Sequence, residues 1–156
     1  PTRPDLKLLV DCWHNEPHIT PATLAAAQLA TPHIAGYSAE ANLRGSFVLY
    51  QALCAHFGRP ETFRYDDLLP PAPAALRLPN PQRPLHALLR DLLFQTTPLA
   101  HLDRALRTAA GDTSTVFKQL RSTCQHRREW SAYRVSRDGI TEAVQQTLSA
   151  LGFRFI

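Results

Sequence analysis

Two polar loops hold the side chains of this chain that could exchange a proton with a ligand. Asp11 and Glu16 follow the apolar run Leu6–Cys12, and His33 ends a second extended segment, "LATPH". If these segments are parallel neighbours in a sheet, their carboxyl ends lie at one edge, where open α/β sheets bind ligands. Glu16 can then hold the His33 ring in one tautomer. A histidine held in this way can exchange a proton with a substrate hydroxyl.

A metal site in the first loop is a competing interpretation, because "HNEPH" contains His14, Glu16 and His18. Two histidines at that spacing share a face only in a helix, and Pro17 disfavours a helix there. A structural zinc ion also needs further ligands close by. We therefore expect no metal.

The elements around these loops predict a crossover at the edge of a sheet. The run Leu6–Cys12 is typical of a strand buried on both faces. A helix follows, with Thr20 as its cap and Pro21 at its first position, and "LATPH" returns to extended structure. Helical spacing then predicts a long helix over Ala39–Phe57, which Gly58 ends, and we expect Gly45 inside it to serve close packing.

A proline-rich stretch, residues 60–84, predicts a connector with little regular structure. Three helices, a strand within "EWSAYRV", a further helix and a last strand, "FRFI", follow it. We therefore expect two parts, residues 1–58 and residues 59–156, the second being a small α+β domain.

Composition limits the function classes. No apolar run is long enough for a membrane span. The net charge is +4, but the 15 arginines are scattered, so we expect an anionic small molecule rather than nucleic acid or a membrane as the ligand. The three cysteines, Cys12, Cys54 and Cys124, favour reduced thiols in a cytoplasmic protein.

The chain begins at Pro1 and contains no methionine, so we expect a processed chain or a fragment. It also lacks the glycine-rich phosphate-binding turn of dinucleotide-binding proteins.

Two groups of residues carry a resemblance to a known family. "VDCWHNEP" followed by "ATPHIAGYS" resembles the closing part of the catalytic core of NAD-dependent D-2-hydroxyacid dehydrogenases. Together with "TPHIAGYS", Glu40, Arg44 and Gly45 and the late "RREW" are similar, more narrowly, to the branch of this family that acts on 4-phospho-D-erythronate.

The resemblance implies an α/β fold: the edge of a Rossmann-type NAD-binding domain with a long crossing helix, followed by an α+β dimerisation domain. It implies that His33 is the acid/base and that Glu16 orients it. Asp11 and Gly36 would lie against NAD, and Tyr37 would touch the substrate. The implied reaction is oxidation of 4-phospho-D-erythronate to its 2-oxo acid in pyridoxal phosphate biosynthesis, by a homodimer. The phosphate-binding turn and a carboxylate-clamping arginine would lie upstream of Pro1.

Three alternatives stay open from the sequence. The isolated chain can be a non-catalytic dimerisation or assembly fragment, in which case adding NAD and substrate gives no turnover. The parent can act on another 2-hydroxy acid. Arg44, Arg127 and Arg128 can contact a substrate phosphate, although we favour a solvent-facing Arg44 and surface salt bridges for the other two.

Overall fold

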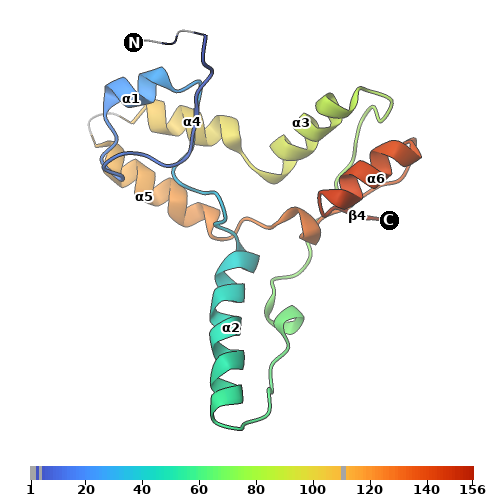
Figure 1. The fold of residues 1–156 in the computed structure, drawn as a ribbon. Coiled ribbons are helices and arrows are strands. Elements are labelled where there is room, and N and C mark those ends of the chain that lie inside the picture. The colour runs from blue at the N-terminus through green and yellow to red at the C-terminus, as the bar shows by residue number, and fades with distance from the viewer. Residues whose placement is uncertain (1–2, 4, 110–111) are drawn as a thin grey trace. The chain divides into compact units, whose positions relative to one another are not determined.

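The computed structural model describes residues 3, 5–109 and 112–156, which form a helix-rich fold with short strands (Figure 1). The helices are α1 (Pro21–Ala26), α2 (Ala39–His56), α3 (Leu85–Thr96), α4 (Leu99–Arg107), α5 (Thr113–Cys124) and α6 (Glu142–Ala150). The strands are β1 (Leu9–Val10), β2 (Leu29–Ala30), β3 (Arg134–Val135) and β4 (Arg154–Phe155), and 3₁₀ turns span Tyr65–Leu68 and Trp130–Ala132. The chain divides into two compact units: residues 1–37 with 98–125, and residues 38–97 with 126–156.

The first unit contains the predicted crossover. β1 and β2 pair in parallel, with Leu9 opposite Leu29, and α1 connects them. Thr20 caps α1 by accepting a hydrogen bond from the Thr23 amide at 3.2 Å, and Pro21 occupies the first helical position. The strands are shorter than predicted, but their parallel pairing is confirmed.

α4 and α5 complete the first unit and supply nearly half of the buried residues of its core. Leu102 and Leu106 of α4 and Phe117 of α5 are buried in one cluster with Trp13 and Ala30. Each fully buried leucine contributes about 1.5–3 kcal/mol by leaving water. This cluster therefore fixes the loops that follow β1 and β2.

Side chains of α4 also satisfy backbone groups of the crossover. Asp103 accepts a hydrogen bond from the Ala30 amide at 2.8 Å, and Arg107 donates to the carbonyls of Leu24 and Ala27 at 3.0 and 2.7 Å.

The two compact units divide the chain differently from the boundary expected at residue 58, because hydrogen bonds such as those of Asp103 and Arg107 join distant segments. Local patterns do not reveal such contacts between distant parts of the sequence. The roles expected of the two parts stay predictions.

The second unit begins with the long helix, which the spacing predicts within one residue. Ser38 caps α2 by accepting a hydrogen bond from the Ala41 amide at 3.0 Å, and Gly58 follows the helix at a φ of +59°. The chain then returns along α2 (Figure 1), where the Tyr50 hydroxyl accepts hydrogen bonds from the amides of Thr62 and Phe63.

The rest of the second unit is a small β–α–β arrangement. β3 and β4 are parallel, with α6 between them in sequence, and Leu76 of the connector forms a further bridge to Val135. A second core gathers there from residues of several segments: Leu76, Leu92, Val135, Ile140, Leu148 and Phe153. The described connector otherwise has little regular structure, as predicted.

The expectation that Gly45 serves close packing is wrong for the described residues. A methyl group at this position would meet no heavy atom within 4 Å. Glycine inside a helix costs about 0.5–1 kcal/mol relative to alanine because it orders more backbone freedom. We therefore expect Gly45→Ala to raise the free energy of unfolding of this chain by about that amount, measured by urea titration with circular dichroism.

Ala52→Gly, at an exposed position of the same helix, is the reverse control and should lower the free energy of unfolding similarly. A loss of stability in Gly45→Ala would show that the glycine packs against another surface after all.

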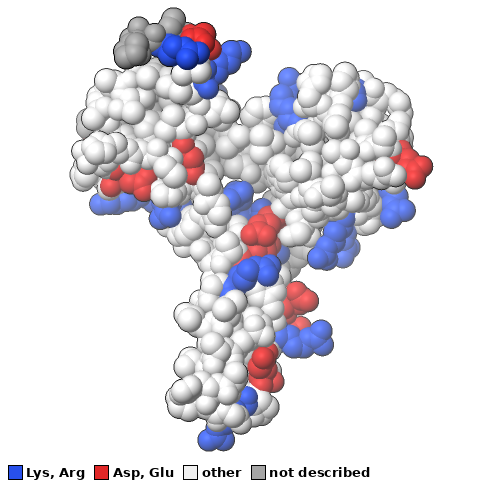
Figure 2. Space-filling model, viewed as in Figure 1, with Lys and Arg blue, Asp and Glu red and all other residues white. Residues whose placement is uncertain are grey.

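The surface carries charges of both signs. On the face shown in Figure 2, basic side chains are interspersed with acidic ones rather than gathered in one patch. None of the helices among the described residues combines the length and apolar character that a bilayer crossing requires. All three cysteines are free thiols.

Candidate active site

Glu16 and His33 meet at the carboxyl ends of the two parallel strands, as the sequence predicts. The His33 Nδ1 atom and a Glu16 carboxylate oxygen are 2.5 Å apart. Both side chains keep about a third of their surface exposed, so a ligand can reach them. The imidazole and the carboxylate form a hydrogen-bonded acid–base pair.

The Glu16 carboxylate stays ionised beside the ring. Its hydrogen bond with His33 holds the pKa of the Glu16 carboxyl below its ordinary value, and the Trp13 amide, 3.3 Å from the second carboxylate oxygen, acts in the same direction. The Trp13 indole also donates to the Thr31 carbonyl at 2.8 Å. One tryptophan therefore joins the loop of Glu16 to the loop of His33.

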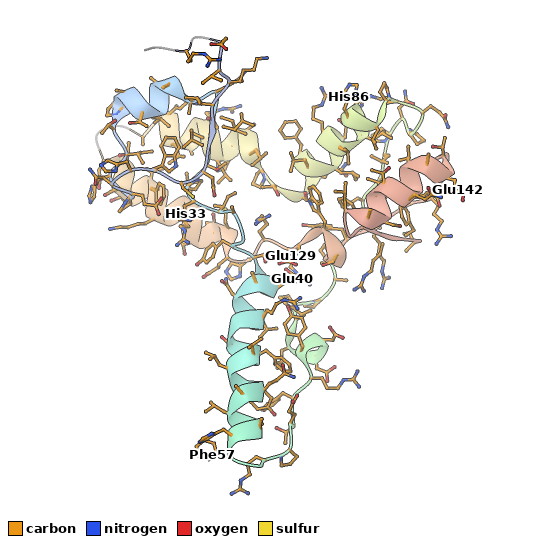
Figure 3. All side chains as sticks on the ribbon, viewed as in Figure 1. His33, Glu40, Phe57, His86, Glu129 and Glu142 are labelled. Atoms are coloured by element: carbon orange, nitrogen blue, oxygen red, sulfur yellow. The ribbon has the colours of Figure 1, made fainter. Side chains whose placement is uncertain are left out.

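His33 has an unusual backbone. Its φ is +52°, a left-handed conformation that costs a non-glycine residue about 1–3 kcal/mol and that clusters at functional sites. Arg121 of α5 donates its Nε hydrogen to the His33 carbonyl at 2.8 Å, and His33 lies beside this helix in Figure 3. His33 is thus held through both its ring and its backbone carbonyl.

Asp11 organises the loop that carries His33. One carboxylate oxygen accepts hydrogen bonds from the Thr31 hydroxyl at 2.6 Å and the Ile34 amide at 2.8 Å, and the other accepts from the Ala35 amide at 2.9 Å. The structure therefore gives Asp11 a positioning role that the sequence did not suggest. Its contact with a cofactor stays a prediction.

Gly36 and Tyr37 follow in the same loop. Gly36 has a φ of +68°, and a side chain there would meet no heavy atom of the described residues within 4 Å. Tyr37 is half-buried, with the Arg121 guanidinium 4.5 Å from its ring centroid. Both predicted site residues thus follow His33 closely in sequence, and Tyr37 also lines a pocket with Glu16.

Known proteins are similar to this chain over nearly its whole length. The chain is 40% identical over 152 residues to the erythronate-4-phosphate dehydrogenase of Shewanella sp. (strain MR-7). It is 37% identical over 150 residues to that of Edwardsiella ictaluri (strain 93-146) and 36% identical over 156 residues to that of Ectopseudomonas mendocina (strain ymp). These alignments cover 96–97% of this chain.

The chain is a homologue of erythronate-4-phosphate dehydrogenases. The resemblance drawn from its motifs is confirmed. It spans 39–42% of the length of these relatives. No family model matches the chain.

The two motifs that point to erythronate-4-phosphate dehydrogenases contact each other in the second unit. Glu40 accepts a hydrogen bond from Arg128 Nε at 2.6 Å and another from the Glu129 amide at 3.0 Å. Glu129 in turn accepts from the Ser38 hydroxyl at 3.1 Å. Figure 3 shows Glu40 and Glu129 together near the start of α2. The motifs therefore form one structural network.

This network corrects the interpretation of Arg128 as part of a surface salt bridge. The side chains of Arg128 and Glu40 are only 11% and 5% exposed. Burial alone would raise the pKa of the Glu40 carboxyl, but the hydrogen bonds from Glu129 and Arg128 outweigh it and hold this pKa below its ordinary value. The pair is buried and charged.

The other two arginines also lie in the second unit. Arg44 is exposed, as expected, with its guanidinium 4.9 Å from the centre of the Tyr65 ring. The Arg127 carbonyl accepts a hydrogen bond from the Ala39 amide at 2.9 Å. The structure thus places neither residue in the loops of the Glu16–His33 pair.

The histidines and the glutamate of the loop "HNEPH" do not gather into one group. Glu16 is engaged with His33, while His14 and His18 are exposed. Among the residues that the structure describes, no group of three or more potential metal ligands occurs.

Sequence reasoning missed Lys118 and Arg121, which line a pocket with Glu16 and Tyr37. They lie three residues apart and so share one face of α5. Only the fold shows that this face is turned toward the loop of His33.

Proposed function

We propose that the full-length protein oxidises 4-phospho-D-erythronate to its 2-oxo acid with NAD, a step of pyridoxal phosphate biosynthesis in the cytoplasm. The observation that carries this proposal is the Glu16–His33 pair at the ends of two parallel strands. The homology to erythronate-4-phosphate dehydrogenases supports the substrate. Each side chain of the pair then has a distinct task.

His33 acts as the base. Because the Glu16 carboxylate accepts its hydrogen bond from Nδ1, the lone pair of the ring lies on Nε2. Nε2 takes the proton of the C2 hydroxyl as the carbonyl forms. Glu16 stabilises the resulting positive imidazolium and keeps the ring oriented.

Residues of the loops that follow β1 and β2 fit NAD. Open space beside Gly36 lets a ligand approach the backbone closely. Asp11 uses three of the roughly four hydrogen bonds that a carboxylate can accept, which leaves room for one more. NAD, when bound, supplies the acceptor for the hydride from C2.

The first unit and α2 would then belong to a larger NAD-binding and catalytic domain. Three apolar residues of the first strand region are exposed: Leu6, Leu8 and Leu9. α2 and its C-cap residue expose four more: Val48, Leu49, Leu53 and Phe57. Apolar groups in such numbers are typical of surfaces that another protein surface covers. They support the larger domain. Exposed apolar residues also occur within residues 59–156, among them Phe63 and Phe94, and these support a homodimer formed through that part.

Glu16→Gln tests the mechanism in the full-length protein. We expect turnover to fall at least about tenfold, a part of the 10²–10⁴-fold that a positioned base contributes. The pH–rate profile should also change, because the carboxyl group whose pKa the His33 hydrogen bond lowers is no longer present to titrate. Rates of NAD reduction across pH measure both effects.

Glu61→Gln, at an exposed glutamate outside the site, is the matched control and should leave the profile unchanged. A Glu16→Gln variant with the wild-type profile would contradict the assigned role of the carboxylate.

A further inference from the structure

A pocket of about 310 Å³ opens beside the acid–base pair in the first unit. Its walls come from the loops of Glu16 and Tyr37 and from one face of α5. The residues of that face are Phe117, Lys118, Arg121 and Ser122. A ligand whose hydroxyl reaches His33 can therefore extend into this pocket.

Two positive side chains line this pocket. Arg121 is fixed by its hydrogen bond to the His33 carbonyl and by its stacking over the Tyr37 ring. A guanidinium has five N–H donors, and in the described residues the His33 carbonyl takes one of them. Lys118 is exposed, one helical turn away.

The charge balance of the pocket favours an anion. Glu16, the acidic residue in the wall, is already paired with His33. The positive charges of Lys118 and Arg121 are therefore not both neutralised within the pocket. Ammonium and guanidinium groups form their strongest hydrogen bonds with phosphate and carboxylate oxygens.

We propose that Lys118 and Arg121 bind the phosphate group of the substrate while His33 acts on its C2 hydroxyl. This inference rests on the proposed function and names the residues that select a phosphorylated hydroxy acid. Arg121 is a positioning residue as well, because it also holds the His33 backbone. The Lys118 side chain makes no hydrogen bond or ion pair among the described residues, so it is the residue to test.

Lys118→Met in the full-length protein is expected to raise KM for 4-phospho-D-erythronate about 10- to 100-fold, the loss of one charged hydrogen bond. The value of kcat should stay close to that of the wild type. KM for D-erythronate, which lacks the phosphate, should not change. Lys118→Arg should restore most of the affinity. Steady-state NAD reduction measures all four.

Lys7 is the only other lysine in the chain and is exposed, so Lys7→Met is the matched control and should behave as wild type. Equal effects of Lys118→Met on the phosphorylated and the plain substrate would overturn the proposal. A weaker affinity for NAD with unchanged KM for the substrate would instead assign the site to the cofactor phosphates and would also overturn it.

Titration with inorganic phosphate separates this inference from the proposed function. If the wild type oxidises neither substrate, calorimetry should still show phosphate binding that Lys118→Met loses and Lys7→Met keeps. Equal binding by all three proteins, or binding by none, would show that the pocket is not an anion site.

Discussion

His33→Ala in the full-length protein is expected to lower kcat for oxidation of 4-phospho-D-erythronate by about 10²–10⁴-fold, the usual contribution of a positioned acid/base. The loss follows from the geometry of the pair. Glu16 holds Nδ1 at 2.5 Å, so Nε2 is the atom that exchanges the substrate proton. Initial rates of NAD reduction measure the effect, and NAD affinity should stay near that of the wild type.

Two further variants separate chemistry from folding. His33→Asn keeps a residue that tolerates the left-handed backbone at this position, and it should be as inactive as His33→Ala while melting at the wild-type temperature. His14→Ala, in the neighbouring loop, is the control and should retain full activity. Rates within a few-fold of wild type for His33→Asn would rule out the proposed base.

Arg128→Ala is expected to lower the free energy of unfolding by about 3–5 kcal/mol, the usual cost of removing one partner of a buried ion pair. Glu40 would keep a buried charge without its positively charged partner, since its side chain is 5% exposed. Arg128 also donates to the carbonyls of Pro70 and Pro71 at 2.9 and 2.6 Å. Guanidinium chloride titration measures the loss.

The effect should depend on pH. Because the pKa of Glu40 is lowered in the folded protein, its stabilisation is complete above the ordinary carboxyl pKa and is lost as pH falls through the folded value. The difference between wild type and Arg128→Ala should therefore narrow in acid. Arg90→Ala removes a pair in which the arginine is 59% exposed and should cost less than about 1 kcal/mol. An equal cost for both variants would contradict the buried role.

Local patterns explain the part of the site that the sequence could predict. The cap residue Thr20 and the following Pro21 set the start of α1. The parallel pairing of β1 and β2 brings Glu16 and His33 to the same edge of the sheet. A geometric rule about strand ends was therefore enough to bring two distant side chains together.

The remaining features depend on contacts between distant segments. Arg107 donates hydrogen bonds to the carbonyls of Leu24 and Ala27, which lie 83 and 80 residues earlier in the sequence. Contacts of this kind join α4 and α5 to the first unit. Arg128 was expected in a surface salt bridge, because nothing in "RREW" shows that this arginine pairs with the distant Glu40 or that the pair is buried. Lys118 and Arg121 lie on a helix whose spacing is clear but whose orientation only packing determines.

Oxidation of 4-phospho-D-erythronate labelled with deuterium at C2 tests the central claim most directly. The full-length protein is incubated with NAD and the labelled acid, and the reduced cofactor and the organic product are examined by mass spectrometry. The account predicts that the reduced cofactor carries the deuterium and that the 2-oxo acid forms in equal amount. A folded protein that binds both ligands yet gives unlabelled or no reduced cofactor would contradict it.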